Sequence, residues 1–565
     1  HRYSFPACIH SECKICELGD KMKKRIMAGI MAAMMVLTMM QTTAFAGSEK
    51  TMEPSTETMC GVSDDTPDLS SQEEGVESGG KPGEADASFD TEYEQHAKTE
   101  ESSETDSVTG KSNASLGIED EEQMTTEESS ETVSEVSEEA LSEEDAIAPI
   151  AETNYEVSNN SELIDALSSI QIGTDTEATI VLKADVTVQS TSGGSSTTFF
   201  GVDGKHITVK SEDGEMKKLI FPFYGILSGD CTFDNVNVIG SRLFCNGYRT
   251  IFTENGQIHL SETLYGGGYK TTVNSSYVVI AATGCINPSS ASGLHDVIGG
   301  SYQGSVEGDT YLEITGDIKM QGGNHLNPGC MKGDGSSGDG AGVPNVYVGG
   351  NATLIYDNKN SIDTASPAIE GTYGCEMKGD VTLDVRAGRV AGIVGTEEPV
   401  DKSIIRGNLH IIAGNPAYEN TDRVLRLGSN WPIIGAGHSF ATMPGAVGNY
   451  TVGGNITIDT YENVWAWDKG TTPDSYDLPE IYGALRGNVD DNITINAHGS
   501  HVQNIFGASD SVVQSSVTVN ATDVELKNSE YDTEYDEGYL FGLWERGIPA
   551  TANGPVTVNV NGGDV

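Results

Sequence analysis

Short segments of alternating apolar and polar residues recur from about residue 300 to the end of the chain, and a glycine with a small polar residue precedes the clearest ones. These segments are 379–385, 407–411, 454–459 and 554–560. Alternation with a period of two indicates β-strands that bury one face, and the glycine indicates a sharp corner before each strand. Because one such strand cannot bury its apolar face alone, the pattern predicts coils that stack on one another.

The length of one coil is clearest in residues 379–406, which contain apolar segments at 381–385, 390–394 and 403–405. Three strands within 28 residues fit one coil of a three-sided solenoid, whereas a sandwich needs hairpins with two-residue turns. A second recurring sequence motif, an aliphatic residue followed closely by glycine, indicates the next side of each coil. It recurs at 298–299, 393–395, 481–483, 505–507 and 540–542. Uneven spacing between coil starts predicts corner insertions, which are expected to form the working face.

A helix is predicted directly before the first long strands, with Asn160 or Ser161 as its N-cap. Its apolar positions fall on one face: Leu163, Ile164, Leu167 and Ile170. Such a helix suits the open end of a solenoid, where backbone and core are otherwise exposed. The sequence therefore predicts an all-β, right-handed parallel β-helix over residues 151–565 with a short N-terminal capping helix.

The N-terminal region predicts export. Residues 22–46 combine a basic start, an apolar run at 26–40 and the small residues Ala44 and Ala46 at a cleavage site, as in a secretory signal peptide. The alternative is a membrane-spanning helix, which needs about 20 apolar residues. The run is shorter than that, so a signal peptide is the better interpretation.

Both ends of the chain look like the edges of a gene fragment. Residues 1–21 precede Met22, and Leu18-Gly19-Asp20 can be encoded so as to contain a ribosome-binding string, so these residues are interpreted as an untranslated leader or an artefact. Their cysteines Cys8, Cys13 and Cys16 lack a clear fourth zinc ligand. The chain stops at Val565 inside a repeat, so the β-helix domain is expected to be truncated, with a cell-wall anchor beyond Val565.

The formal net charge of -53 changes the picture of residues 47–150, which alone carry -27. This segment is rich in Ser, Thr and Glu and contains two aromatic residues, so it cannot bury enough apolar area to offset its ordering entropy. We expect a disordered acidic stalk. A chain this acidic repels nucleic acid and anionic lipid, so no nucleic-acid partner is expected, and membrane contact is expected only through the export signal.

Six cysteines follow the predicted cleavage site: Cys60, Cys231, Cys245, Cys285, Cys330 and Cys375. Export permits disulfides, and Cys231 with Cys245 is the first pair to test. The alternative is that these scattered thiols are small buried hydrophobic side chains, which is the more common role of single cysteines.

The leader, the acidic spacer, the helix at 161–167 followed by 179–182, and the Gly-[Asp/Asn]-apolar-x-apolar coils together resemble a known group. They resemble right-handed β-helix proteins of the pectate-lyase-like superfamily, in the adhesin-like form displayed on Gram-positive bacterial surfaces. The resemblance covers about residues 154–565. It implies the fold and a secreted, extracellular location on the bacterial surface, and it transfers no catalytic residue.

Catalysis on acidic polysaccharide needs clustered or paired carboxylates with a nearby base. The candidates are Asp384 with Arg386, which alternate on one strand, and Asp490 with Asp491 at a corner. The alternative is that such pairs arise by chance on the wet face of any strand. Of the catalytic sequence motifs of the superfamily's hydrolases, only the paired aspartates find a match here, at Asp490-Asp491. No cofactor or metal is expected.

Aromatic residues give a separate indication of binding. Five of them gather in one long corner insertion and around it: Tyr461, Trp465, Trp467, Tyr476 and Tyr482. Exposed indoles and phenols there are suited to stacking on sugar rings, so the predicted partners are extracellular glycans, or host surface or matrix proteins. The alternative is that these rings pin the insertion onto the solenoid.

These observations favour a secreted adhesin-like or structural module at the cell surface, with glycan binding as one candidate activity. The alternative function is a polysaccharide lyase or glycoside hydrolase of β-helix fold. A groove with three or more carboxylates and a basic residue favours the enzyme, and a groove of Thr, Asn and Gly favours binding.

Overall fold

The structure is a computed structural model, and all the residues that it describes belong to the compact unit Glu74–Val565. The described ranges are 153–189, 197–212, 214–286, 297–320, 325–333, 343, 345–359, 367–397, 403–428, 432–437, 450–466, 479–526, 538–545 and 549–563. The predictions for the leader, the signal peptide with its cleavage site and the acidic stalk lie outside these ranges.

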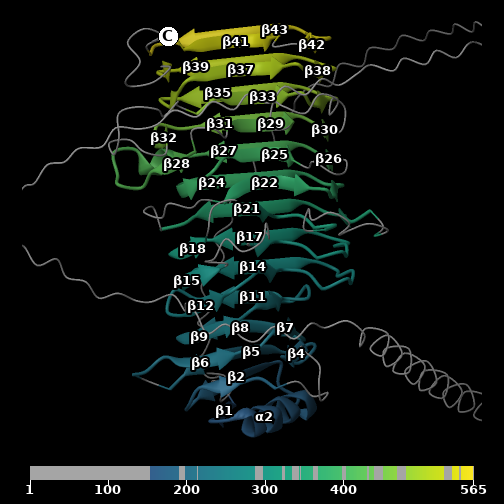
Figure 1. Ribbon diagram of the computed structural model, residues 1–565, viewed down its shortest axis with the longest axis vertical. Helices are drawn as coiled ribbons and strands as arrows, with labels where there is room; N and C mark the ends of the chain where they lie inside the picture. The colour runs from purple at the N-terminus through teal and green to yellow at the C-terminus, as the bar shows by residue number, and fades with distance from the viewer. Residues whose placement is uncertain are drawn as a thin grey trace, which may run out of the picture. The chain divides into compact units, whose positions relative to one another are not determined.

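The described residues form a parallel β-solenoid, as predicted. Every pair of neighbouring strands within its sheets is parallel, and successive coils add one strand at a time to each sheet (Figure 1). Sheet A contains β1 Asn154–Val157, β2 Glu177–Leu182, β5 His206–Ser211, β8 Asp230–Asp234, β11 Arg249–Phe252, β14 Ser276–Ile280, β17 Thr310–Ile314, β21 Ala352–Asp357, β24 Val381–Val390, β27 Leu409–Ala413, β31 Ile456–Thr460, β35 Ile493–His498, β39 Val517–Thr522 and β43 Val556–Asn561. The C-terminal part of β24 also pairs with β28 Leu425–Leu427, which pairs in turn with β32 Val464–Ala466.

Two further sheets complete the N-terminal coils. Sheet B contains β3 Val186–Thr187, β6 Lys217–Ile220, β9 Val236–Gly240, β12 Gln257–Leu260, β15 Thr283–Ile286 and β18 Ile318–Met320. Sheet C contains β4 Thr197–Phe200, β7 Tyr224–Leu227, β10 Arg242–Phe244, β13 Leu264–Tyr265, β16 Val297–Ile298, β19 His325–Asn327, β22 Ala368–Tyr373, β25 Ile393–Glu397, β29 Ile433–Gly437, β33 Ile481–Leu485, β37 Asn504–Ser509 and β41 Tyr539–Trp544.

The sides of the solenoid change part-way along the chain. Each coil from β2 to β19 runs from sheet A through sheet B to sheet C, whereas from β20 onward the coil enters sheet A from sheet D, whose side already has the single parallel bridges Val273–Val306 and Val306–Val348 in the coils before it. Sheet D contains β20 Tyr347–Val348, β23 Glu376–Met377, β26 Ser403–Ile405, β30 Tyr450–Val452, β34 Asn488–Val489, β38 Val512–Val513 and β42 Thr551–Ala552, and a short sheet pairs β36 His501–Val502 with β40 Glu525–Leu526. Sequence analysis did not predict this change.

The motif of glycine and a small polar residue lies at the corner before the strands of sheet A, and the contacts there explain it. The amide N–H of Asn408 donates to the Asp380 Oδ1 at 2.7 Å, and the amide N–H of Asn455 donates to the Asn408 Oδ1 at 2.9 Å. These side chains therefore form a ladder that links successive coils. A Cβ atom on Gly407 would lie 2.5 Å from the Asp380 Oδ1, so the ladder leaves room only for glycine beside it.

The second motif, an aliphatic residue followed by glycine, marks the narrow interior between sheets A and C. A Cβ atom on Gly435 in β29 would lie 2.7 Å from the Cγ2 of Ile456, which points inward from β31. Corresponding glycines in β25, β33 and β37 face inward-pointing side chains of sheet A in the same way. The glycine is therefore required by close approach of the two sheets.

The predicted capping helix is α2 (Asn160–Ile172), and its N-cap is Asn159, one residue earlier than expected. The Asn159 Oδ1 accepts the amide N–H of Glu162 at 3.1 Å, while the Glu162 carboxylate accepts the amide N–H of Ser158 at 2.7 Å. This arrangement resembles a capping box, except that Glu162 accepts the amide of Ser158, which precedes the N-cap, and the sequence analysis did not predict it. Leu163, Ala166 and Ile170 enter the main core, whereas Ile164, expected on the apolar face, is 44% exposed.

The helix packs against β1, next to the first coil (Figure 1). Within the described residues, no helix has the length and apolar character that crossing a membrane requires.

Cys231 and Cys245 are buried thiols that form no disulfide with each other, so the pair that the sequence named as the first to test is not bridged in this structure. Burial raises the pKa of the Cys245 thiol to about 12 and raises that of Cys231 well above its usual value. These thiols act as small core side chains, which was the alternative interpretation. Cys60 lies outside the described residues.

Candidate functional site

The outer face of sheet A carries the candidate residues because β24 alternates between core and solvent. Val381, Leu383 and Val385 are buried, while Asp384 and Arg386 on the opposite face are partly exposed. The Arg386 guanidinium donates to the Asp384 Oδ2 from Nε at 2.9 Å and from Nη2 at 2.6 Å. The structure therefore places the predicted pair together on the outer face.

The charge state of Arg386 follows from this contact. The hydrogen bond with Asp384 is the largest cause that raises the pKa of the guanidinium above its usual value. Arg386 is held as a cation that pairs with a carboxylate. In this arrangement it is a charge partner, and it is a poor candidate for a base that takes up a proton.

The other catalytic candidates lie elsewhere on the stack. Asp490 is exposed at the corner before β35, and the Asp491 Oδ1 accepts the Asn492 Nδ2 at 2.6 Å. Three coil spacings, about 14 Å, separate β24 from β35, because β27 and β31 lie between them. Paired carboxylates in glycoside hydrolases are about 5–9.5 Å apart. Asp384 and these two aspartates therefore do not form one acid–base pair.

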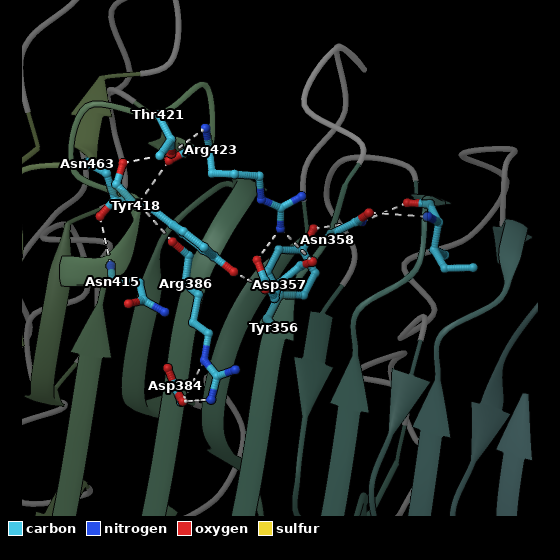
Figure 2. Close-up of polar contacts among 11 residues, drawn as sticks. Tyr356, Asp357, Asn358, Asp384, Arg386, Asn415, Tyr418, Thr421, Arg423 and Asn463 are labelled. Carbon is cyan, nitrogen blue, oxygen red and sulfur yellow. Dashed lines mark hydrogen bonds and ion pairs between the residues drawn. The ribbon is translucent and has the colours of Figure 1, made fainter. Parts of the chain in front are cut away.

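A corner insertion between β27 and β28 is fastened over β21 and β24. Figure 2 shows Tyr418 and Arg423 of this insertion converging on Asp357 at the end of β21. The Tyr418 hydroxyl donates to the Asp357 Oδ2 at 2.6 Å, and the Arg423 guanidinium contacts the Asp357 Oδ1. The Asn463 Nδ2 donates to the Arg386 carbonyl oxygen at 3.0 Å, which joins the insertion that follows β31 to the same network.

This network also affects the proton affinity of Tyr418. Burial and then the hydrogen bond to Asp357 raise the pKa of the phenol, while Arg423 acts in the opposite direction. The insertion thus has charged and hydrogen-bonded anchors on the coils beneath it. The prediction that corner insertions form the working face stays a prediction, and for this insertion the structure shows side-chain contacts to Asp357.

A second carboxylate, which sequence analysis missed, lies on the same row as Asp384. Asp384 pairs in register with Ile412, and Ile412 pairs with Asp459, so the two aspartates are two coils, or about 9.5 Å, apart along the stack. The Asp459 Oδ2 contacts the His410 Nε2 at 2.6 Å, and its Oδ1 accepts the Asn496 Nδ2 at 2.8 Å. Burial acts to raise the pKa of Asp459, but these hydrogen bonds outweigh it and lower the pKa.

Two of the predicted aromatic residues stack on histidines, and one of them, Tyr461, lies near Asp459 and Asp384. The rings of Tyr461 and His498 are 5.7 Å apart between centroids, and those of Trp465 and His501 are 3.6 Å apart. Burial raises the pKa of Tyr461, and the charges of Asp459 and Asp384 raise it further. Tyr461, Trp465, His498 and His501 are called the aromatic strip below.

Arg426 and Glu525 add charge next to the aromatic strip. Arg426 of β28 is the register partner of Trp465 in β32. The His501 Nδ1 contacts the Glu525 Oε2 at 2.6 Å on the other side of the indole. The strip therefore combines ring faces with cationic and anionic hydrogen-bonding groups.

The structure separates Tyr482 from this strip. Tyr482 lies on sheet C, is 1% exposed, and packs with Val394, Ile434 and Phe506. Its hydroxyl contacts the Glu480 Oε2 at 2.8 Å. Its ring is therefore part of the packing on sheet C, and Trp467 and Tyr476 lie outside the described residues.

Metal binding is not indicated by the described side chains. In that part of the chain, no group of three or more His, Cys, Asp or Glu residues is arranged to hold a metal ion.

Comparison of the chain with protein-family models, with curated proteins and with solved structures found no match. The structure thus shows a parallel β-solenoid, and the superfamily that the sequence resembles stays an expectation.

Proposed function

We propose that this chain is an exported β-solenoid that binds extracellular glycans through the aromatic strip and acts as an adhesin-like module at the bacterial surface. The observation that carries the proposal is the placement of Tyr461 and Trp465 on neighbouring elements of the outer face, each with one ring face against a histidine. Tyr461 and Trp465 are both partly exposed, and exposed aromatic surface can pack against the C–H groups of a sugar. The predicted signal peptide and acidic stalk support export and display.

The surrounding charges suit a polar ligand. Arg426, Asp459 and Glu525 lie next to the rings, and sugar hydroxyls both donate and accept hydrogen bonds. Asp384 and Asp357 are each paired with an arginine, which favours positioning and binding over proton transfer. A host surface or matrix protein is the other partner class that the sequence predicts.

One observation favours the alternative function, a glycoside hydrolase or polysaccharide lyase. Asp384 and Asp459 are about 9.5 Å apart along the stack, which is near the upper end of the carboxylate separation in inverting hydrolases. Their hydrogen bonds differ, because Asp384 is paired with Arg386 while Asp459 contacts His410 and Asn496. Shortening of a bound glycan during incubation would establish this function instead.

Glycan-array binding by the full chain and its Trp465→Ala variant tests the proposal. Loss of the indole removes one stacking face, so we expect about tenfold weaker binding, equivalent to about 1.4 kcal/mol. The matched control is Trp544→Ala, because Trp544 stacks on Phe506 in sheet C, away from the strip. Equal affinity of wild type and Trp465→Ala, at an unchanged thermal midpoint, would contradict the proposal.

A further inference from the structure

A row of buried side chains runs along the outer face of sheet C, and it is apolar except at two adjacent coils. Successive coils place Phe244, Tyr265, Ile298, Asn327, Glu370, Val394, Ile434, Tyr482 and Phe506 in this row. The residues before the polar pair belong to one hydrophobic cluster, and those after it belong to another. Asn327 and Glu370 thus interrupt an otherwise continuous apolar ladder.

Both polar side chains are fully buried, at 0% exposure. The Glu370 Oε1 contacts the His325 Nδ1, and the Asn327 Oδ1 accepts the amide N–H of Gly329 at 2.5 Å. Within the described residues, the Glu370 Oε2 and the Asn327 Nδ2 have no hydrogen-bond partner. A buried carboxylate with one free oxygen is costly, and an apolar residue such as the neighbouring Ile298 or Val394 would avoid that cost.

The pair lies where the solenoid changes its sides. Sheet B ends at β18, sheet D begins at β20, and the contact between His325 and Glu370 joins β19 to β22 across this change. His325 is also in ring contact with Tyr373 of β22, at 5.5 Å between centroids. The buried polar group therefore sits at the junction between the coils β2–β19 and the coils β20–β43.

We propose that His325 and Glu370 form a proton-dependent latch that holds β19 against β22 at this junction. A proton on the pair leaves either an ion pair or a neutral acid beside a neutral imidazole. Loss of that proton leaves a buried carboxylate without a cation. The contact between the two groups of coils then weakens, and the junction opens more readily.

The electrostatic surroundings of Glu370 set the sign of this effect. From β19 it faces His325, and its register partner in β25 is the apolar Val394. Burial raises the pKa of Glu370, and His325 lowers it by a smaller amount, so the net pKa is raised. A raised pKa in the folded state means that this contribution to stability is complete below the unfolded pKa and is lost as pH rises through the folded pKa.

Amide hydrogen exchange of the full chain, measured across pH and corrected for the intrinsic exchange rate, tests the latch. We expect protection of peptides covering 325–327 and 368–373 to fall as pH rises in the wild type. In Glu370→Gln, which keeps the shape and removes the charge, the corrected protection should not change with pH. The matched control is Glu376→Gln in β23, which removes a partly exposed carboxylate paired with Arg406 and should follow the wild type.

A wild-type trend that persists unchanged in Glu370→Gln would overturn the proposal. If Glu370→Gln does not fold, His325→Gln provides the second test, because it leaves the carboxylate without its partner. That variant should lose protection in the same two segments while distant strands such as β5 keep theirs. Wild-type protection and wild-type pH dependence in His325→Gln would equally overturn the latch.

Discussion

At the scale of single residues, glycine sets the distance between sheets A and C. Gly435 has no side chain where Ile456 reaches across the interior, and the carbonyl oxygen of Gly483 in the next coil lies on the same side. A methyl group at this position must displace either a core side chain or the backbone of the next coil. Both are close-packed, so neither can move without cost.

We therefore expect Gly435→Ala to lower the free energy of unfolding by about 1–3 kcal/mol. Chemical denaturation measures this change. Gly240→Ala is the matched control, because its new Cβ would be no closer than 3.3 Å to any neighbouring atom, and we expect a smaller loss. Equal losses in the two variants would show that the inner glycines are not limited by space.

Sequence analysis predicted which side chains lie close together when they are neighbours on one strand. It missed side chains that are brought together by the register between coils. Asp384 and Arg386 are two residues apart on one strand, so alternation alone predicted that they share a face. Asp459 lies on the same row as Asp384, but the coil between them carries a long insertion that hides the correspondence. Burial of Tyr482 was equally beyond the sequence, because its ring faces outward on sheet C and other residues cover it.

At the scale of elements, the asparagine ladder explains why the strands of sheet A keep their register. The side chain of Asn455 donates to the Asn408 Oδ1 at 3.0 Å and accepts from the Asn492 Nδ2 at 2.9 Å. Each rung therefore fixes the rung on either side. A one-residue shift in register would turn every inward side chain outward. The asparagine ladder at the strand start opposes such a shift.

We expect Asn455→Ala to lower the free energy of unfolding by about 1–3 kcal/mol, because it breaks the ladder between two coils. Thermal and chemical unfolding measure the loss. Asn553→Ala is the matched control, since Asn553 makes one exposed side-chain contact, to the Gln514 Oε1 at 2.6 Å. A loss no larger than that of the control would mean that the backbone pairing alone holds the register.

At the scale of the whole molecule, the repeat predicted the parallel solenoid, and a separate helical pattern predicted the N-terminal helix, but neither predicted the change of sides between β18 and β20. The alternation of apolar and polar residues shows only that a strand has one buried face. It does not show to which sheet of the solenoid the strand belongs. The switch brings sheet D into the coil and places His325 and Glu370 at the junction. Their pairing, across 45 positions of sequence, could be found only from the structure.

The solenoid thus acts as a frame that brings distant residues into rows, and the proposed function depends on one such row. Trp465 meets Arg426 from the previous coil and His501 from the next one. No segment of the sequence contains all three. The binding surface is therefore a property of the stacked coils rather than of a single insertion.

Hydrogen-exchange mapping of the full chain, with and without the glycan found on the array, tests the central claim most directly. The account predicts new protection in β27, β31, β32 and β36, which carry or border the aromatic strip, and unchanged exchange in the coils from β2 to β16. Protection confined to sheet C or to the N-terminal coils, or none at a saturating glycan concentration, would contradict binding at this strip.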